Sequence, residues 1–250
     1  MDQPTYAQSP QDEFNVQKIQ ALLTAKDDTS RFVGLALLKT LLDNSEELRK
    51  NEDTIRGVWE TISPKFLDRL IKTASQNQDQ DQQQNTKSKD MLDLAVSVLH
   101  TFVTLLPEDA IKHKRAVGRI PQLVACLLHS SEETTRLVLE TLLSLVSQPE
   151  GARELNRIED LTPLTEIAPS HQLALKVLQY AWLGEMATSS DKGALAVKID
   201  KTVGNLVTSF KGTDAVTLLD FLAELLRGLD PEVLSPNPPF VDKTTYQTSC

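Results

Sequence analysis

The feature that most constrains this chain is a leucine-rich helical pattern that returns at nearly constant intervals. In each copy an apolar residue and a leucine precede a polar residue, and these anchor leucines are Leu38, Leu99, Leu139, Leu178 and Leu219. The successive intervals are 61, 40, 39 and 41 residues. Armadillo and HEAT helical repeats stack with a period of about 40 to 47 residues. The spacing therefore predicts an all-α fold, a right-handed α-solenoid of armadillo/HEAT-like helical repeats.

The predicted helix over residues 30–43 shows why this chain needs stacked neighbours. Apolar side chains cover most of its circumference, and only Arg31, Lys39, Thr40 and Asp43 form a narrow polar stripe. A surface helix of a globular domain needs an apolar stripe on only one side, so this helix requires neighbours on several sides. The predicted helix pairs are 14–25 with 30–43, 45–75 with 90–106, 120–129 with 131–147, 157–168 with 170–187, and 193–210 with 213–228.

Local signals place several of the helix boundaries. Asp28 or Thr29 is expected to cap the helix over residues 30–43, because either side chain accepts a hydrogen bond from a free N–H of the first turn. Ser130 and Glu133 are expected to form a capping box. The Ser63–Pro64 pair is typical of an N-cap followed by the first helical residue, which divides the long segment 45–75 into two helices.

The one long interval contains a polar, low-complexity segment, QNQDQDQQQNTKSK, at residues 76–89. Such a segment cannot bury enough apolar surface to offset the loss of chain entropy, so we predict a disordered insert there. We expect a disordered N-terminal segment at residues 1–13 and an armadillo-like helical repeat domain at residues 14–228. Residues 229–250 are expected to form a disordered, proline-containing tail.

The composition argues against several functional classes. A formal net charge of −9 disfavours a nucleic-acid binder or a binder of anionic membranes, since both use a basic face. Cys126 and Cys250 are too few for a disulfide framework, and the N-terminus lacks the basic and apolar regions of a signal peptide. No segment approaches the roughly 18 consecutive apolar residues of a membrane span. We predict a cytoplasmic location without integral membrane association, and a nuclear location is the alternative.

Few residues in the sequence point to chemistry. Cys126 and His129 are one helical turn apart, but a structural zinc site needs four ligands, so a buried cysteine and a surface histidine are favoured. The run KHKR at residues 112–115 is either a solvated loop or a weak nuclear-import element. Trp59 and Trp182 are expected in the core. The nucleotide-binding, metalloprotease and hydrolase motifs GxGxxG, GxxxxGK[ST], HExxH and GxSxG are absent, so we predict no enzyme activity, no cofactor and no metal.

Several segments resemble the neurochondrin family in its fungal-like form. They are SRFVGLALLKTLL (30–42), VWETISPKFLDRLIKT (58–73), LHTFVTLLPED (99–109), GRIPQLVACL (118–127), LVLETLLSLVSQPEGARELN (137–156) and HQLALKVLQYAWL (171–183). The resemblance runs in order through residues 14–228. It implies a cytosolic armadillo-type helical protein without catalytic residues, whose animal relatives are linked to neurite outgrowth and to signalling partners. Members of the family are longer, so the tail is expected to be the end of a shortened chain.

The favoured function is a non-catalytic scaffold that binds a protein or peptide partner along its concave groove. The residue after each anchor leucine is polar, and so are several residues one turn further on, which share a helix face. These residues form a predicted partner-binding ladder, which consists of Lys39, Asp43, His100, Thr104, Glu140, Ser144, Gln179, Asp220 and Glu224. Equally open is the interpretation that they are only the solvated stripe of amphipathic helices.

The ladder becomes acidic towards its C-terminal end, which favours a basic segment of the partner. A nuclear transport or ribosome-assembly adaptor for basic cargo is the alternative function. The last predicted helix, residues 214–228, is as apolar as the internal ones. Terminal repeats need a polar outer face for solubility, so we also predict self-association through this uncapped repeat.

Overall fold

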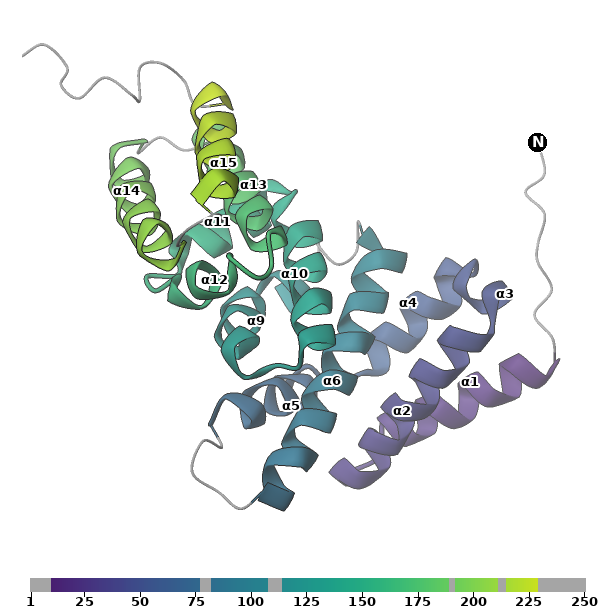
Figure 1. The fold of residues 1–250 in the computed structure, drawn as a ribbon. Coiled ribbons are helices and arrows are strands. Elements are labelled where there is room, and N and C mark those ends of the chain that lie inside the picture. Colours follow the sequence, from purple (N-terminus) through teal and green to yellow (C-terminus); the bar gives the residue numbers. More distant parts are fainter. Residues whose placement is uncertain (1–9, 77–81, 108–113, 189–191, 211–214, 229–250) are drawn as a thin grey trace, which may run out of the picture.

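A computed structural model describes residues 10–76, 82–107, 114–188, 192–210 and 215–228 (Figure 1). Its elements are α1 (Pro10–Leu23), α2 (Asp28–Asn44), α3 (Glu46–Arg49), α4 (Glu52–Thr61), α5 (Pro64–Gln76), α6 (Gln82–Leu105), α8 (Lys114–Val117), α9 (Ile120–Cys126), the 3-10 helix η1 (Leu127–His129), α10 (Glu132–Val146), α11 (Pro149–Arg157), α12 (Thr162–Ile167), α13 (Leu173–Thr188), α14 (Lys192–Ser209) and α15 (Ala215–Gly228). Within these residues there is no strand. The prediction of an all-α fold is confirmed.

The helices that carry the anchor leucines pack against one another in chain order. Helix α2 contacts α6, α6 contacts α10, α10 contacts α13, and α13 contacts α15. In Figure 1 they lead from the α1–α2 end of the molecule to the α14–α15 end. Shorter helices pack beside this row, with α1 against α2, α5 against α6, and α11 against α13. Helices that follow one another along the chain therefore form neighbouring layers of the structure.

The last helix departs from the predicted register. The first four anchor leucines are at most 1% exposed, whereas Leu219 is 64% exposed. Its neighbour Leu218 is buried instead, at 5% exposure. Leu218 stands 40 residues after Leu178, so it continues the repeat more regularly than Leu219 does. The assignment of Leu219 as the fifth anchor was wrong by one residue.

The predicted helix over residues 157–168 corresponds to α12, which spans only Thr162–Ile167, and the structure has a further helix, α11 (Pro149–Arg157), where the sequence predicted none. Pro149 disfavours helical geometry at the preceding residue, and Gln148 is extended, with a ψ of 147°. Helix α11 ends where Ile158 becomes extended. Pro163 then lies in the first turn of α12, where its missing N–H costs no intrahelical hydrogen bond. The prediction that α5 begins at Pro64 is confirmed.

Two predicted caps are displaced by one residue or more. Asp27, rather than Asp28 or Thr29, caps α2, since its side chain accepts a hydrogen bond of 2.7 Å from the Ser30 N–H. Ser131, rather than Ser130, caps α10 by accepting from the Thr134 N–H at 3.2 Å. In each case the capping residue has extended backbone geometry, as the residue preceding a helix requires.

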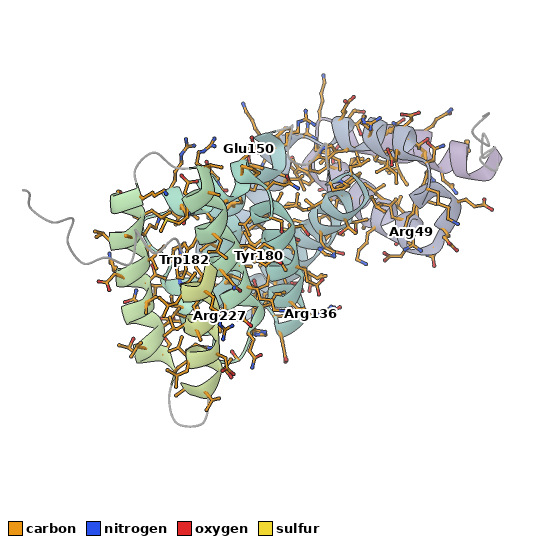
Figure 2. The ribbon with its side chains drawn as sticks, turned by 90° about the horizontal axis from the view of Figure 1, so that it is seen from above. Arg49, Arg136, Glu150, Tyr180, Trp182 and Arg227 are labelled. Carbon is orange, nitrogen blue, oxygen red and sulfur yellow. The ribbon has the colours of Figure 1, made fainter. Side chains whose placement is uncertain are left out.

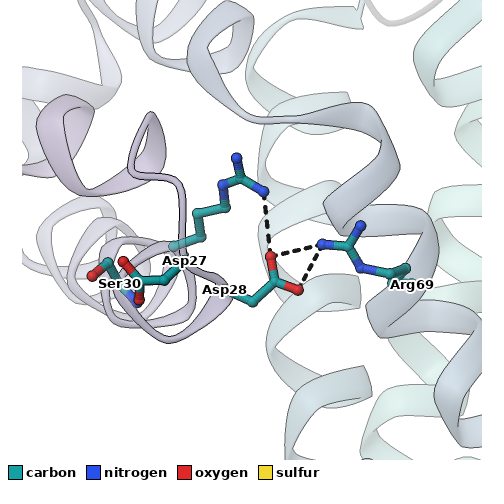
Figure 3. Close-up of polar contacts among 5 residues, drawn as sticks. Asp27, Asp28, Ser30 and Arg69 are labelled. Carbon is teal, nitrogen blue, oxygen red and sulfur yellow. Dashed lines mark hydrogen bonds and ion pairs between the residues drawn. The ribbon is translucent and has the colours of Figure 1, made fainter.

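The displaced cap leaves Asp28 available for a contact between helices. Its carboxylate accepts from Arg69 of α5 at 2.6 and 2.7 Å and from Arg31 of α2 at 3.3 Å (Figure 3). Both guanidinium groups also lie near the Phe66 ring: that of Arg31 is 6.0 Å from the ring centroid and that of Arg69 is 5.8 Å from it. These contacts connect α2 to α5 at the edge of the first layers.

The polar segment at residues 76–89 overlaps two elements. Helix α5 ends at Gln76 and α6 begins at Gln82, so the second part of the segment is helical rather than a loop. Residues 77–81 lie outside the described residues, as do most of the predicted terminal segments at 1–13 and 229–250. Helix α1 begins at Pro10, four residues before the predicted domain boundary. Disorder in the insert and the termini stays a prediction.

The core is largely aliphatic, with aromatic contacts between layers. Trp59 of α4 packs on Phe102 of α6, with ring centroids 4.8 Å apart. Trp182 of α13 packs on Phe221 of α15, with centroids 6.2 Å apart. Both tryptophans are at most 3% exposed, which confirms their predicted place in the core.

Candidate binding surface

The first rung of the predicted ladder is an ion pair within one helix. On α2, the Nζ of Lys39 lies 2.6 Å from Oδ2 of Asp43. Both side chains are more than a third exposed, and such surface pairs contribute little to stability. The two charges satisfy each other, so this rung presents little unpaired charge to a partner.

The middle rung is a polar contact between α6 and α10. His100 places Nδ1 3.2 Å from the Thr141 hydroxyl and Nε2 3.6 Å from a Glu140 carboxylate oxygen. Arg136 donates to the other Glu140 oxygen at 3.0 Å. The structure therefore brings the ladder residues His100 and Glu140 together, and it pairs Glu140 with a cation of its own helix.

Burial lowers the pKa of His100 below its ordinary value of 6.5. The Glu140 carboxylate opposes this shift, whereas the Arg136 cation adds to it. The imidazole is only partly exposed, so its charged form loses hydration without gaining a full counter-ion. A second polar contact joins the same helices, since the Thr134 hydroxyl donates to the Asp93 carboxylate. Thr104 of α6 and Ser144 of α10 are exposed.

The last rungs lie around a surface depression, which we name the Tyr180 pocket. It has a volume of about 510 Å³ and lies between the turn from α10 to α11, the outer face of α13, and α15. Its lining includes Val146, Gln148, Lys176, Gln179, Tyr180, Leu183 and Glu224. The structure thus brings the ladder residues Gln179 and Glu224 to one pocket. Asp220 is exposed one turn before Glu224.

The polar side chains of the Tyr180 pocket are not engaged with the rest of the described chain. Gln148, Lys176, Gln179, Tyr180 and Glu224 make no side-chain hydrogen bond or ion pair with any residue that the structure describes. Their hydrogen-bonding groups face water or a ligand. This distinguishes the pocket from the paired rungs on α2, α6 and α10.

Tyr180 is 51% exposed. In Figure 2 it lies on the C-terminal half of the molecule, well separated from Arg49 at the opposite end. Tyr180, Lys176 and Gln148 were not among the residues predicted from the sequence. The sequence gives little sign that Tyr180 is exposed, because the buried residues Ala181 and Trp182 follow it directly.

A second depression, of about 390 Å³, lies between α2, α5 and α6. Phe32, Phe66 and Leu70 supply apolar walls. The charged residues at its edge, Asp28 and Arg69, are bound to each other, so this depression offers fewer available polar groups than the Tyr180 pocket.

Cys126 and His129 do not form a metal site. The Cys126 thiol is fully buried, its Sγ donates to the Leu123 carbonyl at 3.2 Å, and burial raises its pKa to about 12. A neutral, buried thiol is neither a reactive nucleophile nor a metal ligand. His129 is half-buried in η1. Across the described ranges, no group of at least three His, Cys, Asp or Glu residues could hold a metal ion.

Within the run KHKR, the structure describes the side chain of Arg115. Lys112 and His113 lie outside the described residues. Arg115 donates to the carbonyls of Trp59 and Glu60, each at 3.4 Å, at the C-terminal end of α4. Basic side chains commonly satisfy the last carbonyls of a helix, so Arg115 has a structural role.

A buried arginine also escaped the sequence analysis. Arg119 is 3% exposed, and it donates to the Pro64 carbonyl at 2.9 Å. Its Nε lies 2.9 Å from an Asp68 oxygen. Burial lowers the pKa of Arg119, and the Asp68 carboxylate opposes that shift. The contact ties α5 to the segment before α9, so it holds layers together.

Taken together, these features define the class: a layered all-helical protein whose available polar groups lie on open surfaces. In the part of the chain that the structure describes, no helix is both long and apolar enough to cross a lipid bilayer. The chain belongs to the neurochondrin family, whose family model matches residues 11–244. The resemblance seen in the sequence is confirmed.

Comparison with individual proteins adds one relative. An uncharacterized protein of Schizosaccharomyces pombe (strain 972) is 32% identical over 136 residues, which is 54% of this chain and 20% of that protein. The chain thus aligns with about a fifth of its relative's length. No solved structure matches the chain.

Proposed function

We propose that this chain is a non-catalytic, armadillo-like scaffold that binds a protein or peptide partner on the surface formed by α10, α13 and α15. One observation carries the proposal: the Tyr180 pocket gathers polar side chains that have no partner among the described residues. Four other ladder residues form pairs, Lys39 with Asp43 and His100 with Glu140. Membership of the neurochondrin family is consistent with a non-catalytic scaffold.

The chemistry of the pocket fits recognition of another protein. Exposed tyrosines supply a large, rigid contact surface, and they are enriched among residues that dominate binding energy. Pro149 and Leu183 add apolar surface beside Tyr180. A few polar groups around an apolar floor are typical of binding clefts.

The solenoid character rests on two observations. The anchor leucines recur at close to 40 residues, and the helices that carry them pack consecutively. Stacked repeats of this kind form extended surfaces that bind partners. The right-handed superhelix and the concave position of the ladder remain predictions.

A nuclear transport or ribosome-assembly adaptor for basic cargo is the alternative proposal. This alternative depends on the run KHKR at residues 112–115 and on the acidic residues of the ladder. Arg115 is held by helix carbonyls, and Glu140 is paired with Arg136. Both observations weaken the alternative relative to a scaffold. Localisation of the tagged chain tests it, since a steady nuclear or nucleolar signal favours the adaptor.

Self-association through the last layer is a further proposal. Val216, Leu219 and Leu226 of α15 are 62%, 64% and 51% exposed. On a helix these positions lie on the same side, so they form an apolar strip, which we name the α15 strip. It occupies the flank of α15 that no described helix covers.

Site-specific photo-crosslinking in cells tests the scaffold proposal. A photoreactive phenylalanine analogue in place of Tyr180 should give an adduct of defined mass. The same analogue in place of Arg49, which is exposed and far from the pocket (Figure 2), is the matched control and should give none. Lack of an adduct at position 180, or equal labelling at both positions, would refute a partner site at this pocket.

A further inference from the structure

The chemistry of the Tyr180 pocket specifies a kind of ligand. The inference that follows rests on the proposed function, because it presupposes that the pocket binds a partner. The floor is apolar, with Pro149 and Leu183 as its accessible apolar residues. The half-exposed ring of Tyr180 stands beside this floor. An apolar side chain of a ligand would lose water against the floor, which stabilises the complex in proportion to the area buried.

The charges around the pocket are divided between two helices. Glu224 of α15 lies on the lining, and Asp220 is exposed one turn before it on the same helix face. Lys176 of α13 lies on the lining as well. Arg227 on α15 and Glu150 beside Pro149 are exposed as well. The α15 wall therefore carries two carboxylates to one guanidinium.

The amide side chains complete the pattern. Gln148 and Gln179 line the pocket from α10–α11 and from α13. Each amide has donors and an acceptor, and neither amide group forms a hydrogen bond with the residues that the structure describes. Extended peptide backbone presents N–H and C=O groups in alternation. The two glutamines can therefore bind backbone, which gives affinity without demanding a particular side chain.

We infer that the Tyr180 pocket binds an extended peptide segment in which an apolar residue is next to a basic residue. The apolar side chain packs on Pro149 and Leu183. The basic side chain lies between the Tyr180 ring and the Glu224 carboxylate, where it gains a cation–π contact and a charge-assisted hydrogen bond. Lys176 precedes Tyr180 by one turn on α13, so the cation is expected on the α15 side of the ring, next to Glu224.

A display library of short random peptides, selected on the purified chain, tests this chemistry. The selected peptides should share an apolar residue adjacent to Arg or Lys. Their affinity should fall about tenfold or more in Tyr180→Ala, as for a residue at the centre of an interface. Glu224→Gln should weaken binding and reduce its dependence on salt, since it removes the charge that faces the cation.

Matched variants keep the test specific. Arg49→Gln changes an exposed residue outside the ladder, at the opposite end of the molecule (Figure 2), and it should leave affinity unchanged. Glu224→Lys should shift selection towards peptides with Asp or Glu. Tyr180 and Glu224 are exposed, so circular dichroism should show unchanged helicity in these variants.

Three results would overturn the inference. They are a consensus rich in acidic residues on the wild-type chain, binding that is insensitive to Tyr180→Ala, and the absence of any binder above background. The scaffold proposal is decided separately, by photo-crosslinking from position 180. An adduct there with no peptide consensus would leave a partner site whose ligand is a folded surface instead of an extended segment.

Discussion

Helices α10 and α15 have similar lengths and similarly apolar sequences, yet they lie in different surroundings. Helix α10 buries eight of its 15 residues, whereas α15 buries three of its 14. The former is packed between α6 and α13, while the latter has α13 and α14 as neighbours. The difference shows that the number of packed neighbours, rather than the apolar content of a helix, sets how much of its surface leaves water.

The contacts between helices also differ between the interior and the C-terminal end of the stack. At the α6–α10 contact, polar side chains meet across the two helices, with His100 beside Thr141 and Glu140. At the α13–α15 contact, Trp182 packs on Phe221. The interior of the stack combines apolar packing with cross-helix hydrogen bonds, while the terminal layer relies on apolar packing and leaves a bare strip.

The largest expected difference in stability is between two single variants, one with a leucine of α10 replaced and one with a leucine of α15 replaced. Leu142 of α10 is fully buried and Leu219 of α15 is 64% exposed. Leu142→Ala should lower the free energy of unfolding by about 2–5 kcal/mol, because it removes buried methyl groups and leaves a cavity. Leu219→Ala should change it by no more than about 0.5 kcal/mol. Urea denaturation measures both, and equal losses would contradict the comparison.

Two glycines sharpen the comparison. A Cβ on Gly151, just after α10, would lie 2.0 Å from the Leu145 carbonyl oxygen. Gly151→Ala should therefore lower the free energy of unfolding by about 1–3 kcal/mol through overpacking.

The matched change in the terminal layer is Gly204→Ala on α14. Nothing lies within 4 Å of the position its Cβ would take. Alanine is the better helix former, so this variant should be more stable by roughly 0.4–1 kcal/mol. Thermal melting of the two variants should shift in opposite directions, and a shift in the same direction would show that the terminal layer is packed as tightly as the interior.

The α15 strip leads to a prediction about association. Leu219→Glu combined with Leu226→Glu should shift the chain from oligomers to monomer, because the charges prevent burial of the strip. The free energy of unfolding should change by no more than about 0.5 kcal/mol per site. Light scattering over a range of concentrations measures the shift. Val197→Glu, at a 72% exposed position of α14, is the control and should not alter association; a wild-type chain that stays monomeric at high concentration would exclude this proposal.

The smallest expected effect is a pH dependence at the α6–α10 contact. The pKa of His100 is lowered in the folded chain, chiefly by burial, so the unfolded chain takes up the proton first as pH falls. The contribution to stability is therefore complete above the ordinary pKa of 6.5 and declines as pH falls below it. His100→Gln should have a melting temperature that depends less on pH between about 7 and 5. His129→Gln should retain the wild-type dependence, and an unchanged profile in His100→Gln would contradict the assignment.

Much of the architecture was available from the sequence. Apolar periodicity identifies helices because a side chain's face is fixed by local backbone geometry. The recurrence of such helices indicated layers, and the quoted segments identified the family. Helix starts at proline were less secure, since the start of α5 at Pro64 was predicted correctly while α11, which begins at Pro149, was missed. Two helix caps were misplaced by one or two residues, because adjacent Ser, Thr and Asp residues compete for that role.

The binding surface was only partly predictable. Of the ladder residues, Gln179 and Glu224 meet at one pocket. The sequence did not reveal that Lys39 pairs with Asp43, or that Glu140 pairs with Arg136. Whether a polar side chain is available to a partner depends on which atoms of neighbouring turns and helices it reaches.

The sequence by itself determined that this chain is helical, that a leucine pattern recurs about every 40 residues, and that the chain belongs with the neurochondrins. Only the tertiary structure decided which side chains remain available. Leu218 and Leu219 show the reason, since one residue turns an α-helix by about 100° and separates a buried leucine from one that is 64% exposed. Tyr180 is exposed for the same reason, while its neighbour Ala181 is buried. The rotation of each helix against its neighbours comes from packing across about 40 residues of sequence, which local patterns do not encode.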